Sequence, residues 1–176
     1  MKQKFRLLIF VLAALRLAAP PAFAAEKASR PSPAPDFSLK DAAGQVHTLA
    51  EFKGRVLVVD FWASWCGPCK TSFPALDALQ EEFQGEGLQV LAINVDENAK
   101  DAHAFLAGRT PSLTVLFDSK GKSPLDFKVE GMPSSFLIDR EGNLRFQHMG
   151  FNAKSKAEFR QQISLLLKEG SPHAQQ

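Results

Sequence analysis

Cysteine is scarce in this chain of 176 residues: there are two, Cys66 and Cys69, and only two residues separate them. A disulfide that staples a fold joins distant segments, so the spacing excludes a structural disulfide framework. Structural zinc needs four ligands, and the sequence offers no second cysteine pair and no cysteine–histidine cluster. The pair is therefore predicted to carry out redox chemistry rather than to hold the fold together.

The sequence also lacks a long uninterrupted hydrophobic run. Its apolar stretch at 7–15 is followed by Arg16 and two prolines, well short of the roughly 20 residues of a membrane span. Basic residues precede the stretch, and small residues surround Ala24, which together predict a signal peptide over 1–24 with cleavage after Ala24. We expect a periplasmic or otherwise exported protein, and an uncleaved membrane anchor is the open alternative.

A basic patch of the kind that binds nucleic acid is missing as well. Cleavage after Ala24 would remove four basic and no acidic residues, which changes the formal net charge from +2 to about −2. The expected partners are therefore proteins or small molecules. A domain of about 150 residues buries enough surface to fold without disulfides, so its stability need not depend on its redox state.

The chain divides into four parts by composition. After the signal peptide, residues 25–36 are rich in proline and predict an extended linker. One folded domain is expected over 37–169, followed by a polar, frayed tail over 170–176.

Within the domain, the hydrophobic pattern alternates between the periods of strands and helices. Strands are expected at 37–39, 45–49, 55–62, 88–95, 113–117, 135–138 and 144–149. Helices are expected at 67–83, from a cap at Asn98 to Gly108, and from a capping box at Ser155–Glu158 to Gly170. This order predicts an α/β fold, a mixed central sheet flanked by helices with an N-terminal β-hairpin.

The two cysteines lie where a buried strand is followed by a helix. Unpaired backbone amides and the positive end of the helix dipole favour a thiolate at the first cysteine. Cys66 is therefore predicted to attack a partner disulfide, and the more shielded Cys69 to resolve the mixed disulfide. Gly67 is expected to allow a close approach of the backbone, and Pro68 to stiffen the turn without losing a needed N–H.

Asp60 is an acidic residue in an otherwise apolar strand. An ionised carboxylate there is costly unless it is paired or kept protonated, so a functional role is predicted. The alternative is a carboxylate near the strand end that reaches solvent.

Residues 59–69, Val-Asp-Phe-Trp-Ala-Ser-Trp-Cys-Gly-Pro-Cys, resemble the active-site segment of the thioredoxin superfamily. The resemblance is strongest to exported TlpA, ResA and CcmG or DsbE-like thiol:disulfide oxidoreductases. It rests further on the signal peptide, on the segment 34–39 with its hairpin, and on the long stretch 96–132. It implies a thioredoxin fold with a central helix–strand insertion over 98–117.

The resemblance implies a substrate-binding role for residues around the cysteines, including some that are distant in the sequence. Segment 131–136 is similar to the superfamily's cis-proline segment, so Pro133 is expected to follow a cis peptide bond and to face the cysteines. The backbone beside Pro133 would pair with substrate as an added strand. Met132 departs from the commoner Thr, Val or Ile: it either packs or offers a soft thioether for tuning or metal binding. Trp65 is expected on the exposed rim around Cys66, and Trp62 in packing.

The resemblance also assigns the acid. Asp60 matches the aspartate that exchanges a proton with the resolving cysteine of thioredoxin. Many ResA-like and TlpA-like proteins instead carry a glutamate at the position of Ser72 and a neutral residue at that of Asp60. We hypothesise that the proton-handling acid has moved from the helix to the strand.

The expected function is reduction of disulfides in exported proteins, with the Cys66–Cys69 pair as the redox centre and no other cofactor or metal. Gly and Pro between the cysteines resemble the active sites of reducing thioredoxins, whose reduction potential is about −270 mV, rather than those of strong oxidants, whose potential is about −120 mV. Electrons would come from a membrane thiol transporter, and substrates could include apocytochrome c or a copper-site protein. Two alternatives remain: a thiol peroxidase, and a copper-binding assembly factor using both cysteines with Met132.

Overall fold

The computed structural model describes residues 31–169. The predicted signal peptide at 1–24, the first part of the predicted linker and the predicted tail lie outside these residues. Among the described residues, no helix is long and apolar enough to cross a membrane.

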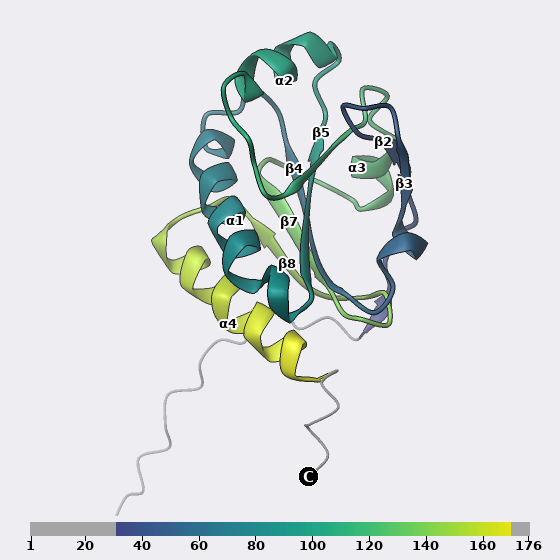
Figure 1. The fold of residues 1–176 in the computed structure, drawn as a ribbon, viewed down its shortest axis with the longest axis vertical. Helices are drawn as coiled ribbons and strands as arrows, with labels where there is room; N and C mark the ends of the chain where they lie inside the picture. The colour runs from purple at the N-terminus through teal and green to yellow at the C-terminus, as the bar shows by residue number, and fades with distance from the viewer. Residues whose placement is uncertain (1–30, 170–176) are drawn as a thin grey trace, which may run out of the picture.

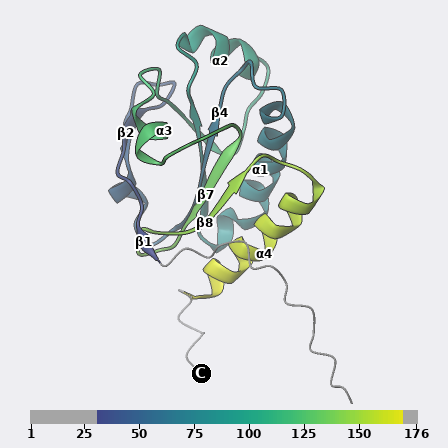
Figure 2. The ribbon, with the colours of Figure 1, turned by 180° about the vertical axis from the view of Figure 1, so that it is seen from behind.

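The described part of the chain forms a curled mixed sheet with helices on both faces (Figures 1 and 2). The strands run in the order β1-β8-β7-β4-β5-β6-β2-β3. Their bounds are β1 Ser32–Pro33, β2 Ser38–Lys40, β3 Val46–Thr48, β4 Val56–Trp62, β5 Leu88–Asn94, β6 Thr114–Phe117, β7 Ser134–Ile138 and β8 Asn143–Met149. Strand β4 is parallel to β5 and antiparallel to β7. The predicted mixed sheet with an N-terminal hairpin is confirmed.

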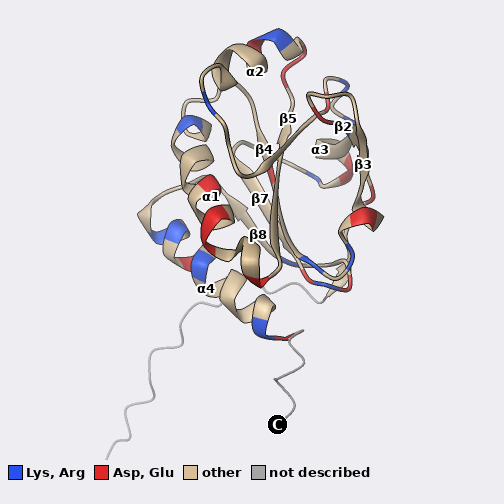
Figure 3. Ribbon diagram, viewed as in Figure 1, with Lys and Arg blue, Asp and Glu red and all other residues tan. Residues whose placement is uncertain are grey.

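Helices α1 and α4 cover one face of the sheet, and α3 lies against the other, inside the curl (Figures 1 and 2). The helix bounds are α1 Cys69–Phe83, α2 Ala99–Leu106, α3 Lys122–Asp126 and α4 Ala153–Glu169, with short 3-10 turns at Leu49–Phe52 and Gln84–Glu86. Figure 3 shows acidic and basic residues side by side on α1 and α4.

Strand β4 is the centre of the core, and all seven of its residues are buried. Alternate side chains point to opposite faces of a strand. Val56, Val58 and Trp62 therefore pack toward α1 and α4, whereas Leu57 and Phe61 enter the second core cluster, with Phe127 after α3. Burial on both faces explains why the strand is almost uniformly apolar, and it makes the charged residue within it unusual.

The sheet begins earlier than the sequence predicted. Ser32 and Pro33 pair with β8, and the Ala34 N–H donates to the Gly142 carbonyl at 3.0 Å. The expected start of the folded region near Phe37 is therefore too late. A proline fits this two-residue edge strand because it can leave one edge without a donor.

Helix α3 was not predicted, because its five residues follow a turn and include a proline. The buried Asp118 stabilises its start: one carboxylate oxygen accepts the Ser123 N–H at 2.6 Å and the Ser123 hydroxyl at 2.5 Å. A side-chain acceptor of this kind replaces the missing intrahelical partner of an N-terminal amide.

The predicted capping box of the last helix is wrong by one turn. Helix α4 begins at Ala153, and the reciprocal bonds join Asn152 and Ser155: Asn152 Oδ1 accepts the Ser155 N–H at 3.0 Å, and Ser155 Oγ accepts the Asn152 N–H at 2.7 Å. Asparagine is as good an N-cap as serine, so the pattern fitted two positions. The predicted burial of Phe159, Ile163 and Leu166 is confirmed.

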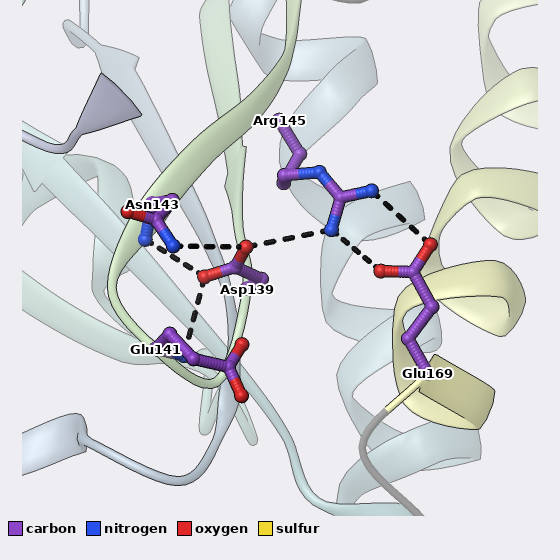
Figure 4. Close-up of polar contacts among 5 residues, drawn as sticks. All are labelled: Asp139, Glu141, Asn143, Arg145 and Glu169. Carbon is purple, nitrogen blue, oxygen red and sulfur yellow. Dashed lines mark hydrogen bonds and ion pairs between the residues drawn. The ribbon is translucent and has the colours of Figure 1, made fainter. Parts of the chain in front are cut away.

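Asp139 holds the turn between β7 and β8 (Figure 4). One oxygen accepts the N–H groups of Asn143 and Glu141, at 2.8 and 3.2 Å, and the other lies 3.4 Å from Arg145 Nη1. Arg145 in turn pairs with both oxygens of Glu169 at the end of α4. The network thus connects a hairpin to the last helix.

Asp139→Ala should lower the free energy of unfolding by roughly 1–3 kcal/mol, because two turn amides lose their acceptor. Glu169→Ala is the matched control: it removes the exposed end of the same network and should cost only about 0–1 kcal/mol. Urea denaturation of the two variants checks this. Equal losses would show that the turn amides do not depend on Asp139.

Candidate active site

The cysteine pair lies in the connection between β4 and α1. Cys69 is the first residue of α1, two positions later than the predicted helix start, and Cys66 precedes it, joined to it by a disulfide. The Cys69 N–H points at Cys66 Sγ, 3.3 Å away. A backbone donor at the start of a helix stabilises negative charge on that sulfur, so the geometry favours a thiolate at Cys66.

Exposure distinguishes the two sulfur-bearing residues in the expected order. Cys66 is 5% exposed and Cys69 1%, so both are largely covered and Cys66 is the more accessible. Beside them the Trp65 side chain is 69% exposed, which places it on the rim as predicted. A partner would thus meet Trp65 and Cys66 before Cys69.

Gly67 and Pro68 directly precede α1, and Pro68 is its N-cap residue. The Pro68 carbonyl accepts the N–H groups of Thr71 and Ser72 at 3.0 and 3.1 Å, so proline occupies a position where its own N–H is not needed. A Cβ at Gly67 would meet no atom of the described chain within 4 Å. Crowding by described residues other than its two chain neighbours therefore does not explain this glycine.

Asp60 is fully buried in the middle of β4, so the alternative of a solvent-reaching carboxylate is wrong. Its strand neighbours are Ala92 on β5 and Ser135 on β7. Oδ1 accepts a hydrogen bond from Ser135 Oγ at 2.5 Å, while Oδ2 has no partner among the described residues. Burial raises the pKa of Asp60 from 3.8 to about 7, although the bond from Ser135 lowers it in part.

Asp60 lies on the face of the sheet that α1 and α4 cover (Figure 1). It is two residues from both Val58 and Trp62 and so shares their face of β4, and these two residues belong to one core cluster with Cys69 and Phe73 of α1. The buried carboxylate and Cys69 therefore belong to the same layer, between the sheet and α1.

Pro133 lies at the same end of the sheet as the cysteines. The Met132–Pro133 peptide bond is cis, as the resemblance implies. The next residue, Ser134, pairs with Phe61, one position before the end of β4, where the cysteine loop begins. Met132 is partly buried and packs against the core cluster that contains both cysteines. This contact supports the packing alternative for Met132.

Asp96 is a buried residue of the cysteine loop that sequence reasoning missed. Its carboxylate accepts the Ser64 N–H at 3.0 Å, the Ser64 hydroxyl at 3.1 Å and the Asn94 amide at 2.8 Å. The loop before Cys66 is therefore attached to the end of β5. The polar residues Asn94 and Asp96 at the end of an apolar strand were the available signal, but nothing local identified Ser64 as the partner of Asp96.

Trp62 and Ser72 complete the surroundings of the pair. Trp62 is fully buried, and its ring contacts Phe73 and Phe105 with centroid distances of 5.1 and 5.0 Å, which confirms its predicted packing role. Ser72 is buried in α1, and its hydroxyl donates to the Cys69 carbonyl at 3.2 Å. Over residues 31–169 there is no group of three or more His, Cys, Asp and Glu residues that could hold a metal ion.

Comparison with known proteins agrees with this geometry. The Redoxin family model matches residues 30–163. The thioredoxin-like protein YneN of Bacillus subtilis is 34% identical over 71% of this chain and 74% of its own length. The thiol-disulfide oxidoreductase ResA of the same species is 32% identical over 68% of this chain and 66% of its own.

Solved structures show the same fold. The crystal structure of a Chlorobium tepidum protein assigned as the thiol:disulfide interchange protein DsbE has 44% identity and a TM-score of 0.76, over 80% of this chain and 99% of that one. The exposed lipoprotein thioredoxin Etrx1 of Streptococcus pneumoniae has 31% identity and a TM-score of 0.66, over 74% and 99%. The predicted thioredoxin fold is confirmed, and the chain belongs to the Redoxin family as a thiol-disulfide oxidoreductase of the ResA and DsbE type.

Proposed function

We propose that this oxidoreductase is exported and reduces disulfides in other exported proteins. The observation that carries the proposal is the Cys66–Cys69 pair at the start of α1, with a helix-start amide directed at Cys66 and a buried acid in the same layer. The two cysteines supply the redox chemistry, so no further cofactor is required.

The reaction follows from the positions of the two sulfurs. The Cys66 thiolate attacks one sulfur of a substrate disulfide; the Cys66–substrate bond forms, and the second substrate sulfur leaves as a thiolate. Cys69 then loses its proton and attacks Cys66 Sγ. The Cys66–Cys69 disulfide forms, the first substrate sulfur leaves, and two electrons have passed to the substrate.

Asp60 is proposed as the acceptor of the Cys69 proton. A general base works best when its pKa lies near the operating pH, and burial raises the pKa of Asp60 to about 7. An ordinary aspartate would be too weak a base. The buried position thus gives the carboxylate a proton affinity suited to a thiol at neutral pH.

Substrate is proposed to bind around Trp65, Gly67 and Pro68 and along the backbone at Met132 and Pro133. Trp65 offers an exposed aromatic face, and Gly67 leaves open space beside the cysteines. An extended segment pairing with the backbone at Met132 would be held in line with Cys66. Apocytochrome c and copper-site proteins are candidate substrates because both carry cysteines that must be reduced before they bind a cofactor.

Reduction in an oxidising compartment needs electrons from elsewhere. We propose a membrane thiol transporter as the donor that reduces the Cys66–Cys69 disulfide after each turnover. Export is supported by the basic and apolar N-terminal sequence and by the name of Etrx1, which describes an exposed lipoprotein.

The direction of electron flow can be tested by equilibrating the protein with dithiothreitol and glutathione buffers. We expect a reduction potential nearer to about −270 mV than to about −120 mV, together with reduction of insulin disulfides. The Cys66→Ser/Cys69→Ser variant is the control for uncatalysed exchange. A potential in the oxidising range would reverse the proposed direction.

Export can be tested separately by N-terminal sequencing of the protein from an exported fraction. The mature sequence should begin at Ala25.

A further inference from the structure

Three side chains lie in a row across the sheet beneath α1 and α4. Asp60 on β4 is paired with Ser135 on β7, and Ser135 is paired with His148 on β8. All three are buried. Directly paired residues of antiparallel strands have their Cβ atoms roughly 5 Å apart on the same face. Ser135 is therefore placed between an acid and an imidazole.

The side chains in this row make separate contacts. Ser135 Oγ donates to Asp60 Oδ1 at 2.5 Å. His148 instead lies 2.6 Å from Gln162 Oε1 and stacks on Phe159, with the ring centroids 4.4 Å apart. On the other side of Asp60, β5 offers Ala92, which has no polar side-chain atom. Among the described residues, Ser135 thus provides the hydrogen bond that the Asp60 carboxylate receives.

We propose that Ser135 is a positioning residue, whose hydroxyl holds Oδ1 of Asp60 and leaves Oδ2 free to accept the Cys69 proton. The inference rests on the proposed function, in which Asp60 is that acceptor. Oδ2 is buried and lacks a hydrogen-bond partner within the described part of the chain, so it is the oxygen available to a thiol. The proton leaves Cys69 Sγ as the Cys66–Cys69 bond forms, and it ends on Oδ2.

The hydroxyl also adjusts how strongly Asp60 holds a proton. A hydrogen bond donated to a carboxylate stabilises its charged form and lowers its pKa, which opposes the effect of burial. Ala92 and Ser135 flank Asp60 in the sheet, and α1, which begins at Cys69, packs on the face of β4 that carries Val58 and Trp62. His148, paired with Ser135, is the next titratable group along the row. Loss of the hydroxyl should therefore move the titration of Asp60 to higher pH.

Ser135→Ala tests the proposal, with Ser135→Thr as the variant that restores a hydroxyl. The titration midpoint of Asp60, followed by the carbon-13 shift of its carboxyl group, should rise by about one pH unit in Ser135→Ala. Ser135→Thr should return it toward the wild-type value. At pH 7 the slow phase of oxidation by oxidised glutathione, in which Cys69 resolves the mixed disulfide, should fall about fivefold, because fewer molecules hold ionised Asp60.

Ser123→Ala is a matched control. Ser123 is a buried serine of α3, on the opposite side of the sheet. Its hydroxyl donates to the buried Asp118 at 2.5 Å. Its loss should leave both the Asp60 midpoint and the slow phase unchanged.

Asp60→Asn separates failure of this inference from failure of the proposed function. If the pH profile of the slow phase is unchanged in Asp60→Asn, Asp60 is not the proton acceptor and the proposed mechanism fails. If Asp60→Asn alters that profile but Ser135→Ala leaves the midpoint in place, only the role of Ser135 is overturned. A Ser135→Ala/Asp60→Asn variant that is no slower than Asp60→Asn alone would support the inference, because the serine then acts through the acid.

Discussion

Cys66→Ser should abolish disulfide reduction, leaving only the slow exchange seen without protein. The amide of Cys69 directs its N–H at this sulfur, and Cys66 is the more accessible of the pair. Serine keeps the shape of the residue but cannot form the mixed disulfide. Insulin reduction by dithiothreitol, with and without the variant, measures the effect.

Cys69→Ala should trap the mixed disulfide instead, because Cys66 can still attack a substrate but the second cysteine that resolves the mixed disulfide is lost. The protein should accumulate in mixed disulfides, visible as bands on non-reducing gels that dithiothreitol removes. Captured in its native compartment, this variant would also identify the substrate. The Cys66→Ser/Cys69→Ala variant is the control that should capture nothing.

Two other outcomes would overturn the assignment of roles. If Cys66→Ala captures partners and Cys69→Ala does not, the nucleophile is Cys69. If neither single variant forms mixed disulfides while the reduced wild-type protein consumes peroxide, the chain acts as a thiol peroxidase rather than as a disulfide reductase.

The parts of this site that could be predicted are those encoded by neighbouring residues. Strand β4 is apolar except for Asp60, and the two cysteines follow it closely. The local pattern therefore sufficed to predict that Cys66 is the more accessible of the two. The burial of Asp60 followed from the same apolar pattern. For Pro133, the resemblance supplied what the pattern of the sequence did not.

The parts that were missed depend on the register of distant strands. The Ser135 hydroxyl reaches Asp60 because β7 pairs with β4 in one register, and a shift of one residue would turn it to the other face. Asp96 binds Ser64 because the ends of β4 and β5 are neighbours in the sheet. Neither partner can be identified from its own segment, since serine and aspartate are common at strand ends and in turns.

Asp60→Asn should make the protein more stable at pH 8. The folded state holds a proton on Asp60 up to about pH 7, whereas the unfolded chain releases it near 3.8. The folded state therefore binds more protons between these values, and the free energy of unfolding of the wild type falls as the pH rises from about 4 to 7. The rise of the pKa corresponds to roughly 4 kcal/mol, an upper bound on what Asp60→Asn can recover.

Urea denaturation of the oxidised protein at pH 4, 6 and 8 checks this expectation. The gain should be about 1–4 kcal/mol at pH 8, because the new amide is itself unpaired, and it should shrink toward pH 4. Asp118→Asn is the matched control: Asp118 is buried but accepts two hydrogen bonds from Ser123, so its replacement should not stabilise the protein. A gain for Asp60→Asn that did not vary with pH would show that folding does not raise the pKa of Asp60.

The same substitution should slow the resolution of mixed disulfides by about 100-fold or more at pH 7, the usual scale for loss of a general base. Stability and activity would then change in opposite directions at one residue. An ionised carboxylate with one unpaired oxygen lowers stability in a fully buried strand, so packing alone does not account for its presence there. The proposed transfer of the Cys69 proton would account for it, because that reaction requires an acceptor that is buried, incompletely paired and able to titrate near neutral pH.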